Sequence, residues 1–431
     1  MIYENLGTNK LGHLTFAGQD TVSLANEFGT PLYVMDELRI RERCREYKAA
    51  MGNAFPNGSL PLYASKALST KRIYEIMKDE DMGIDVVSIG EIYTALKAGY
   101  PMGKAYFHGN NKTDEDLTFA MDNGIGYFVC DNFDELEALN KLAGEKGIIQ
   151  KVLLRLTPGI DTHTHDKIST GRVDSKFGAP IETGQAEQLV LVALKQANIE
   201  LVGYHCHIGS QIFEHTPFVD AARIMIEFVG KMAKEHNYLA EFLNLGGGMG
   251  VPYVEANEKI NYTKNIAVIG ELIGKACQTY GIEVPKILME PGRSIVADSG
   301  ITLYTVGASK NIPGFKNYTS IDGGMTDNLR YALYQADYTV ELANRINEEK
   351  TFLTDVVGRC CESGDIIQEK VMLPKPTRGD IIAVLSTGAY NYSMASNYNR
   401  IPRPAMIMIN QDGPYLAIKR ETLDDLVSND C

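Results

Sequence analysis

Eight short apolar runs punctuate the first three hundred residues, and stretches of helix-forming sequence separate most of them. The runs cover residues 60–64, 83–87, 105–107, 126–129, 152–156, 201–204, 242–245 and 287–289. A repeated order of strand, loop and helix is typical of a parallel sheet. Eight such units are sufficient to close a (β/α)8 barrel, in which functional side chains follow the carboxyl ends of the strands. The sequence therefore predicts a barrel of this kind.

The regions between and after these runs complete the predicted architecture. Helical patterns occupy residues 39–50, 70–78, 91–98, 114–123, 134–145, 186–197, 217–236 and 265–280. Beyond about residue 300 the pattern becomes β-rich, with runs at 302–306, 339–342, 352–357, 380–385 and 406–409 and a hairpin turn at 411–413. We therefore expect a second domain, a β-sandwich or β-barrel, after the (β/α)8 barrel.

Composition narrows the class of protein. The formal net charge of −13 is spread along the chain without a long basic block, which argues against nucleic acid as a partner. Seven cysteines without regular spacing are typical of reduced intracellular thiols. Neither a signal peptide nor an apolar stretch of membrane-spanning length is evident. We expect a cytoplasmic enzyme that does not bind membranes.

Lys66 follows the first apolar run directly. A lysine in a barrel mouth can lose hydration, which favours the free amine and makes it available for a Schiff base with a carbonyl compound. Taken alone, a solvated loop lysine would be the simpler interpretation. The residues that follow the other runs change that balance.

The seventh and eighth runs end in residues suited to a phosphate-bearing ligand. Gly246, Gly247 and Gly248 follow the seventh run, and loops after these two barrel strands often bind phosphate. Glu290 and Arg293 follow the eighth run. The glutamate could hold a protonated ring nitrogen and the arginine could bind phosphate or carboxylate. A tight turn and a simple ion pair of Glu290 with a neighbour are the alternatives.

The sixth run leads into two histidines. His205 and His207 share one face of the strand, so one of them could stack on an aromatic cofactor while Ser210 binds phosphate. Metal binding, aided by the acidic and histidine-rich residues 161–166, is the alternative. These pairs lack the tight spacing of known zinc or iron sites, and we therefore expect no metal.

The β-rich half carries polar clusters of its own. Arg330 and Tyr334 would meet if their segment is helical, and with a carboxylate they would form a clamp for a zwitterionic substrate. The vicinal cysteines 360 and 361 precede an acidic motif and a glycine turn, where one thiol could act as an exposed acid. Inert packing is the alternative for the cysteines.

Together these motifs resemble those of the fold-type III pyridoxal-phosphate decarboxylases, from residues 28–33 to residues 397–404. The glycine triplet is common to that superfamily, whereas residues 327–330 with 361–365 are more specific to its diaminopimelate-decarboxylating member. The family adds the N-terminal strand to its β domain and works as a homodimer with shared active sites. The resemblance therefore implies a barrel over residues 37–300 and a β domain built from residues 1–36 and 301–431.

The resemblance also implies site residues. The cofactor contacts would be Lys66, His207, Ser210, Gly246, Gly247, Gly248, Glu290, Gly292, Arg293 and Tyr390, and the substrate contacts would be Arg293, Arg330, Tyr334, Glu362 and Tyr390. Lys66 would form the Schiff base and Cys361, reaching over from the partner subunit, would be the proton donor. Two positions depart from the family pattern, since Tyr331 replaces a usual proline and Asn391 a common glycine.

The implied reaction is the decarboxylation of meso-2,6-diaminopimelate to L-lysine and CO2, the last step of lysine biosynthesis, through a quinonoid that Glu290 favours. Arg330 and Tyr334 would bind the second carboxylate of that substrate. A decarboxylase of another basic amino acid (lysine, ornithine, arginine or carboxynorspermidine) is the nearest alternative. A non-catalytic cofactor-binding protein and a metal-dependent barrel hydrolase are the alternatives from other classes.

Overall fold

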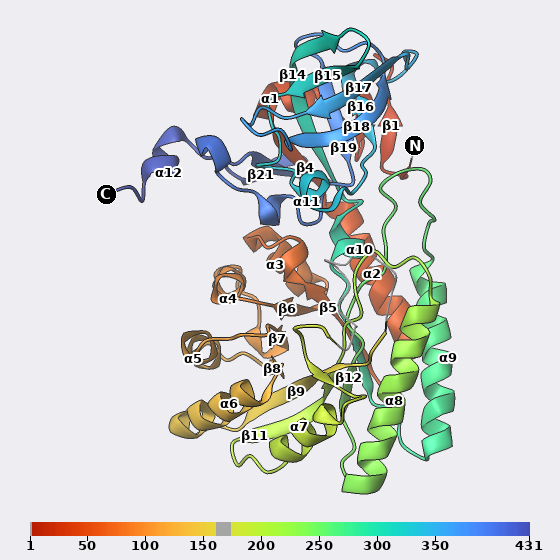
Figure 1. Cartoon of the computed structure of the whole chain (residues 1–431), viewed down its shortest axis with the longest axis vertical. Helices are drawn as coiled ribbons and strands as arrows, with labels where there is room; N and C mark the ends of the chain where they lie inside the picture. The colour runs from red at the N-terminus through yellow and green to blue at the C-terminus, as the bar shows by residue number, and fades with distance from the viewer. Residues whose placement is uncertain (1, 161–173) are drawn as a thin grey trace. The chain divides into compact units, whose positions relative to one another are not determined.

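The computed structural model describes residues 2–160 and 174–431. They pack into two compact units (Figure 1). The first unit comprises Arg43–Gly250 and Ile260–Gly292, and the second comprises Met1–Glu42, Val251–Lys259 and Arg293–Cys431. The histidine-rich segment at residues 161–166, named as a metal alternative, lies outside the described residues.

A closed parallel barrel forms the first unit. Its strands are β5 (Ser59–Ala64), β6 (Gly83–Val86), β7 (Ala105–Phe107), β8 (Tyr127–Cys130), β9 (Gln150–Thr157), β11 (Ile199–His205), β12 (Phe242–Asn244) and β13 (Lys286–Met289). Neighbours pair in the order β9-β11-β12-β13-β5-β6-β7-β8, and the pairing of β8 with β9 closes the ring. The predicted barrel and its eight strands are confirmed. A short strand, β10 (Ala179–Pro180), extends the end of β9.

Apolar side chains fill the barrel because every strand is buried between its neighbours and the surrounding helices. One cluster takes a single buried side chain from each of seven strands: Leu62, Tyr106, Val129, Leu153, Val202, Phe242 and Leu288. The strands are thereby held in register around a packed interior. The polar residues that continue each strand are left at its carboxyl end.

Helices lie on the outer side of the barrel strands (Figure 1). They are α3 (Lys71–Asp79), α4 (Ile89–Lys97), α5 (Asp114–Asp122), α6 (Phe133–Lys146), α7 (Gln185–Ala193), α8 (Thr216–His236) and α9 (Tyr262–Tyr280), preceded by α2 (Glu37–Ala54). The side chains of Thr70, Ser88 and Asn132 accept hydrogen bonds from the first backbone N–H groups of their helices. All eight predicted helices are present, and their ends differ from the prediction by a few residues.

A nine-stranded sheet forms the centre of the second unit. Its strands are β4 (Leu32–Asp36), β14 (Gly300–Ile312), β15 (Lys316–Ile321), β16 (Val340–Leu342), β17 (Phe352–Val357), β18 (Ile366–Leu373), β19 (Ile381–Leu385), β20 (Ala405–Asn410) and β21 (Gly413–Ile418). Strand β4 lies between β14 and β20, which confirms that the N-terminal strand joins the C-terminal β domain.

Several elements of the second unit were not predicted. Strands β15, β18 and β21 are among them, as are a small sheet of β1 (Leu6–Thr8), β2 (Leu14–Phe16) and β3 (Gln19–Asp20) with the helix α1 (Thr21–Phe28) that follows it. Short helices α10 (Arg293–Val296), α11 (Arg330–Tyr334) and α12 (Leu423–Val427) complete the unit. No helix in the described part of the chain is both long enough and apolar enough to cross a bilayer.

Candidate active site

Lys66 lies on a single 3-10 turn, Ser65–Ala67, directly after β5. Its neighbours Ser65 and Ala67 are buried, so the turn is fixed, whereas Lys66 itself is exposed. Desolvation of this amine was a possibility that the sequence left open, whereas the structure has the side chain of Lys66 exposed. The barrel nevertheless presents a primary amine at the carboxyl end of its first strand.

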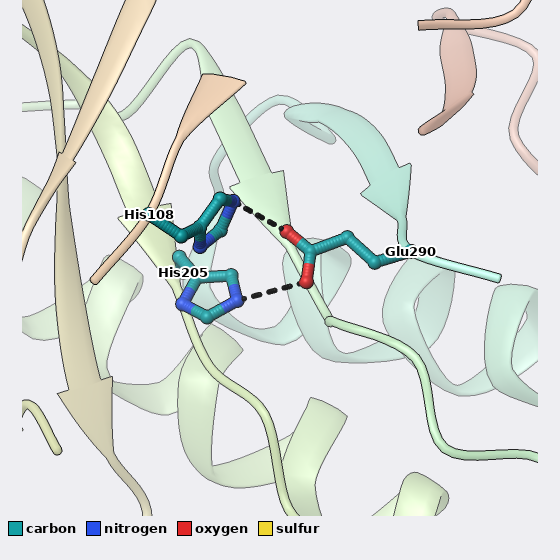
Figure 2. Close-up of side chains that lie close together, drawn as sticks. All are labelled: His108, His205 and Glu290. Carbon is teal, nitrogen blue, oxygen red and sulfur yellow. Dashed lines mark hydrogen bonds and ion pairs between the residues drawn. The ribbon is translucent and has the colours of Figure 1, made fainter. Parts of the chain in front are cut away.

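Glu290 lies at the end of β13 in a buried cluster of polar side chains (Figure 2). Each oxygen of the carboxylate faces a different histidine. The Nε2 atom of His108 lies 3.0 Å from Oε1, and the Nε2 atom of His205 lies 3.2 Å from Oε2. Asn244 donates a 2.6 Å hydrogen bond to Oε1. The candidate ligand atoms of His108, His205 and Glu290 lie within 4.8 Å of one another, so these three residues are also the ones that could bind a metal ion.

Burial and charge set the protonation of this cluster. Burial tends to raise the pKa of Glu290, but His108 and His205 outweigh it and hold the pKa well below its usual range. Burial lowers the pKa of His205 to about 4, so this imidazole is neutral at pH 7. Burial also raises the pKa of Asp85, which lies 3.8 Å from His108, to about 6. The cluster thus keeps an ionised carboxylate inside the barrel end.

The glycine triplet after β12 permits three backbone segments to meet. A Cβ on Gly247 would lie 2.0 Å from the carbonyl oxygen of Glu290, and one on Gly248 would lie 2.2 Å from that of Gly209. Gly246 has a positive φ of 67°. A larger residue at any of the three would push the loops after β11 and β13 away. The glycines are therefore required by packing, whatever ligand they meet.

His207 and Ser210 follow β11 in the same region. The Nδ1 atom of His207 accepts a 3.2 Å hydrogen bond from the backbone N–H of Gly247. Burial, with the positive charge of Lys66 adding to it, holds the pKa of His207 well below its usual value. The ring is therefore neutral and tied to the glycine loop. Ser210 is half-buried three residues further on.

The second unit carries the predicted arginines. Arg293, buried at the start of α10, donates a 2.7 Å hydrogen bond to the hydroxyl of Tyr253, and its guanidinium lies 4.6 Å from the ring centre of Tyr390. Tyr390 has a φ of 69°, an uncommon backbone conformation for a bulky side chain and one found often at functional sites. Arg330 begins α11 and donates to the hydroxyl of Tyr338 at 2.9 Å.

The helix α11 spans Arg330 to Tyr334, so the segment that carries the predicted substrate clamp is helical as expected. Tyr334 is half-buried. The aromatic residues packed on the guanidinium of Arg330 include Tyr253 and Tyr338, which the sequence argument did not single out.

The cysteine motif forms the loop between β17 and β18. Cys361 and Glu362 are exposed, and Cys360 is partly buried, where burial raises the pKa of its thiol to about 11. Asp365 holds this loop from inside, because its carboxylate accepts hydrogen bonds from the backbone N–H groups of Met325 (2.6 Å) and Cys360 (2.7 Å). Cys361 therefore sits at the outer edge of a fixed loop.

The two departures from the family pattern have structural roles. Tyr331 donates a 2.9 Å hydrogen bond to Glu369 on β18, which anchors α11 to the sheet. The side-chain oxygen of Asn391 accepts a 3.2 Å hydrogen bond from Tyr338, the same tyrosine that binds Arg330. Asn391 thus supports the arginine indirectly.

Sequence reasoning missed part of the site. His108 directly follows the third apolar run, so the rule that identified Lys66 and Glu290 could have found it. Asp85 lies inside the second run, where a carboxylate among apolar residues was the available signal. Tyr253 had a weaker signal, an aromatic residue shortly after the glycine triplet. Tyr338 had none, because its contact with Arg330 depends on the turn that ends α11.

These residues fit a cofactor that combines an aldehyde, a phosphate and a basic ring nitrogen. The barrel end offers an amine, an ionised buried carboxylate and a glycine loop. Within the described residues, the buried atoms Nδ1 of His205 and Oδ1 of Asp85 have no hydrogen-bond partner, so polar capacity remains for a ligand. Fold and donor set together define a barrel enzyme of the pyridoxal-phosphate class.

Comparison with known proteins makes the assignment specific. Residues 37–297 match the family model described as pyridoxal-dependent decarboxylase, pyridoxal binding domain. The chain is 45% identical to the diaminopimelate decarboxylase of Bacillus subtilis over 98% of this chain and 96% of that protein.

Solved structures agree with this. The diaminopimelate decarboxylase of M. jannaschii in complex with L-lysine has a TM-score of 0.90 at 34% identity, covering 99% of this chain and 98% of that one. A lysine/ornithine decarboxylase of Vibrio vulnificus complexed with putrescine has a TM-score of 0.75 at 25% identity, covering 90% and 96%.

The chain belongs to the pyridoxal-dependent decarboxylases, in the group whose members are named diaminopimelate decarboxylase. It is an enzyme, and its cofactor is pyridoxal 5'-phosphate.

Proposed function

We propose that this enzyme decarboxylates meso-2,6-diaminopimelate to L-lysine and CO2, the last step of lysine biosynthesis, as a cytoplasmic homodimer. The observation that carries the proposal is the buried Arg330 guanidinium, whose neighbours are tyrosines. A substrate with a second carboxylate would supply an anion for this cation. The full-length similarity to diaminopimelate decarboxylases supports the same choice.

The barrel residues would hold the cofactor. Lys66 Nζ would attach covalently to its aldehyde carbon, His207 would stack on its ring, and Ser210, Gly246, Gly247, Gly248, Gly292 and Arg293 would surround its phosphate, with Tyr390 nearby. When bound, pyridoxal phosphate supplies the electron sink for loss of the carboxylate. Glu290 is ionised and buried, so it would keep a proton on the ring nitrogen beside it.

The second unit would bind the far end of the substrate. Arg330, Tyr334 and Arg293 would contact the carboxylate that is not lost, with Glu362 and Tyr390 completing the pocket. A diamine-forming decarboxylase needs an acidic group at this position instead, and the aromatic surroundings of Arg330 argue against that alternative.

Cys361 would supply the proton that replaces the lost carboxylate. The thiol is exposed on the loop fixed by Asp365, which suits donation into the active site of a partner subunit. The two chains of a homodimer would then share both active sites.

The first test is CO2 release by the purified, cofactor-loaded enzyme from meso-, LL- and DD-diaminopimelate, L-lysine and L-ornithine. We expect release from the meso isomer, with the other compounds at background. Faster release from lysine or ornithine would refute the proposed substrate. Borohydride reduction followed by peptide mass analysis should place the cofactor mass on the peptide that contains Lys66, and Lys66→Ala should abolish that label.

The second test addresses the proton donor and the shared sites. Cys361→Ala should lower kcat by about 10²- to 10⁴-fold, whereas the matched variant Cys360→Ala should change it by less than about threefold. Co-refolding inactive Lys66→Ala with inactive Cys361→Ala at equal amounts should restore about a quarter of wild-type activity, because mixed dimers regain one intact site. No recovery in mixed dimers would exclude donation between subunits.

A further inference from the structure

Among the described residues, no carboxylate forms an ion pair with the guanidinium of Arg330. It is buried, donates one hydrogen bond of 2.9 Å to Tyr338, and lies 4.4 Å from the ring centre of Tyr253 and 5.4 Å from that of Tyr338. Its Nε atom is buried without a hydrogen-bond partner in the part of the chain that the structure describes. Burying an arginine in this way is costly unless an anion arrives, because its remaining donors have lost water.

Tyr253 contacts both Arg293 and Arg330. Its hydroxyl oxygen accepts the 2.7 Å hydrogen bond from Arg293, while the face of its ring lies against Arg330. One side chain thus uses its polar end for one arginine and its aromatic face for the other. The positions of the two guanidinium groups are therefore linked through one phenol side chain.

The backbone of Tyr253 is itself held firmly. Its N–H donates to Asn257 Oδ1 at 2.9 Å, and its carbonyl oxygen accepts hydrogen bonds from the N–H (3.1 Å) and the hydroxyl (2.9 Å) of Thr339. The ring meets that of Tyr338 edge-on, with centres 5.5 Å apart. These contacts leave the ring little freedom to turn, so it can serve as a rigid spacer.

The electrostatics show why an aromatic residue suits this position. Burial raises the pKa of Tyr253, yet the charges of Arg293 and Arg330 outweigh it and lower the pKa overall. The tyrosine thus interacts electrostatically with both cations but does not carry the full negative charge of an aspartate or glutamate. A carboxylate here would neutralise Arg330 and weaken its attraction for an incoming anion.

We propose that Tyr253 is a positioning residue for substrate specificity: the face of its ring holds Arg330 and leaves that guanidinium available for the distal carboxylate of the substrate, while its hydroxyl makes a separate contact with Arg293. This inference rests on the proposed function, since it assumes a substrate with that carboxylate.

Equilibrium binding of two compounds tests the inference without turnover. L-lysine keeps the distal carboxylate and 1,5-diaminopentane lacks it, so the ratio of their Kd values measures recognition of that group alone. The cofactor-loaded enzyme is titrated with each compound, following the absorbance of the bound cofactor. We expect Tyr253→Leu to weaken L-lysine binding by about 10- to 100-fold while 1,5-diaminopentane changes by less than about threefold.

Tyr253→Phe separates the two contacts. It keeps the ring against Arg330 and removes the hydroxyl that binds Arg293, so the Kd ratio should stay within about threefold of wild type. Dilution should release cofactor faster from this variant, because the Arg293 contact would be lost. Tyr262→Leu is the matched control, since Tyr262 is also buried near the glycine loop and donates to Gly250 at 3.0 Å. Its Kd ratio should equal that of wild type.

The outcomes distinguish the inference from the function on which it rests. A wild-type enzyme that binds both compounds equally would refute recognition of the distal carboxylate, and with it the proposed substrate. A wild-type preference that persists in Tyr253→Leu would overturn the role of Tyr253 alone. A preference that Tyr253→Phe abolishes would also overturn it, because the ring face would then not be what holds Arg330.

Discussion

Asp365 controls the stability of the loop that carries Cys361. Its buried carboxylate accepts two short hydrogen bonds, from the backbone N–H groups of Met325 and Cys360, and its own carbonyl oxygen accepts one of 2.9 Å from Gly358. The perturbation is Asp365→Asn, which keeps the shape of the side chain. It replaces one accepting oxygen with an NH2 group that faces a backbone donor.

The expected magnitude follows from the lost contact. A hydrogen bond to a charged acceptor contributes about 1.5–3 kcal/mol, and the substitution removes at least one and leaves two donors facing each other. The loop should therefore open more easily by about 2–3 kcal/mol, which corresponds to roughly 30- to 150-fold faster amide exchange by local opening. Because Cys361 lies on this loop, kcat should fall by about tenfold or more.

Native-state hydrogen exchange measures this directly at the amides of Met325 and Cys360. Gly364→Ala is the matched control in the same loop, since Gly364 is exposed and a Cβ there would meet nothing within 4 Å. Gly358→Ala should reproduce the effect of Asp365→Asn, because its Cβ would lie 2.3 Å from the carboxylate. Exchange that accelerates by less than about threefold in Asp365→Asn, or equally in Gly364→Ala, would refute the reasoning.

Two further predictions concern the barrel unit. Gly247→Ala should lower the free energy of unfolding by about 1–3 kcal/mol and weaken cofactor retention, because its Cβ would lie 2.0 Å from the carbonyl oxygen of Glu290; urea titration checks this, and Gly274→Ala, in open space on α9, should cost nothing. Burial lowers the pKa of His205 from 6.5 to about 4, so the unfolded imidazole takes up its proton at higher pH than the folded one, and wild type loses stability as the pH falls between these values. The free energy of unfolding of His205→Gln, measured relative to wild type, should therefore rise by about 3 kcal/mol between about pH 7 and pH 4. The free energy of unfolding of a variant of the exposed His215 should stay within about 0.5 kcal/mol of wild type at every pH. A constant difference between His205→Gln and wild type would contradict the assignment.

The spacing of apolar residues predicted the strands and helices that are buried on one face or on all sides. All eight barrel strands are continuous apolar runs, and their helices carry apolar stripes, so both signals are strong in a single sequence. Strand β15 (Lys316–Ile321) was not predicted because it is polar and only partly buried, so its sequence carries little apolar alternation. Strands β1, β2 and β3 were not predicted because each is only two or three residues long.

The same distinction applies to the site. Lys66 and Glu290 were predictable because they stand at strand ends, where a barrel collects its functional groups. The exposure of Lys66 and the contact of His108 with Glu290 depend on how loops of different strands meet, which no local pattern records. Tyr253 became visible only through its two arginine neighbours, one of which is 77 positions away along the chain.

The position of β4 between β14 and β20 has a consequence for how the protein is made. This strand leaves the ribosome early, yet both of its hydrogen-bonding neighbours come from the last third of the chain. The apolar residues of β4 therefore have no strand to pair with while the barrel is synthesised and folds. A chain that ends before β14 would leave β4 without either neighbour, and one that ends between β14 and β20 would leave one of its edges unpaired. Such an exposed strand edge is a target for chaperones and can start aggregation.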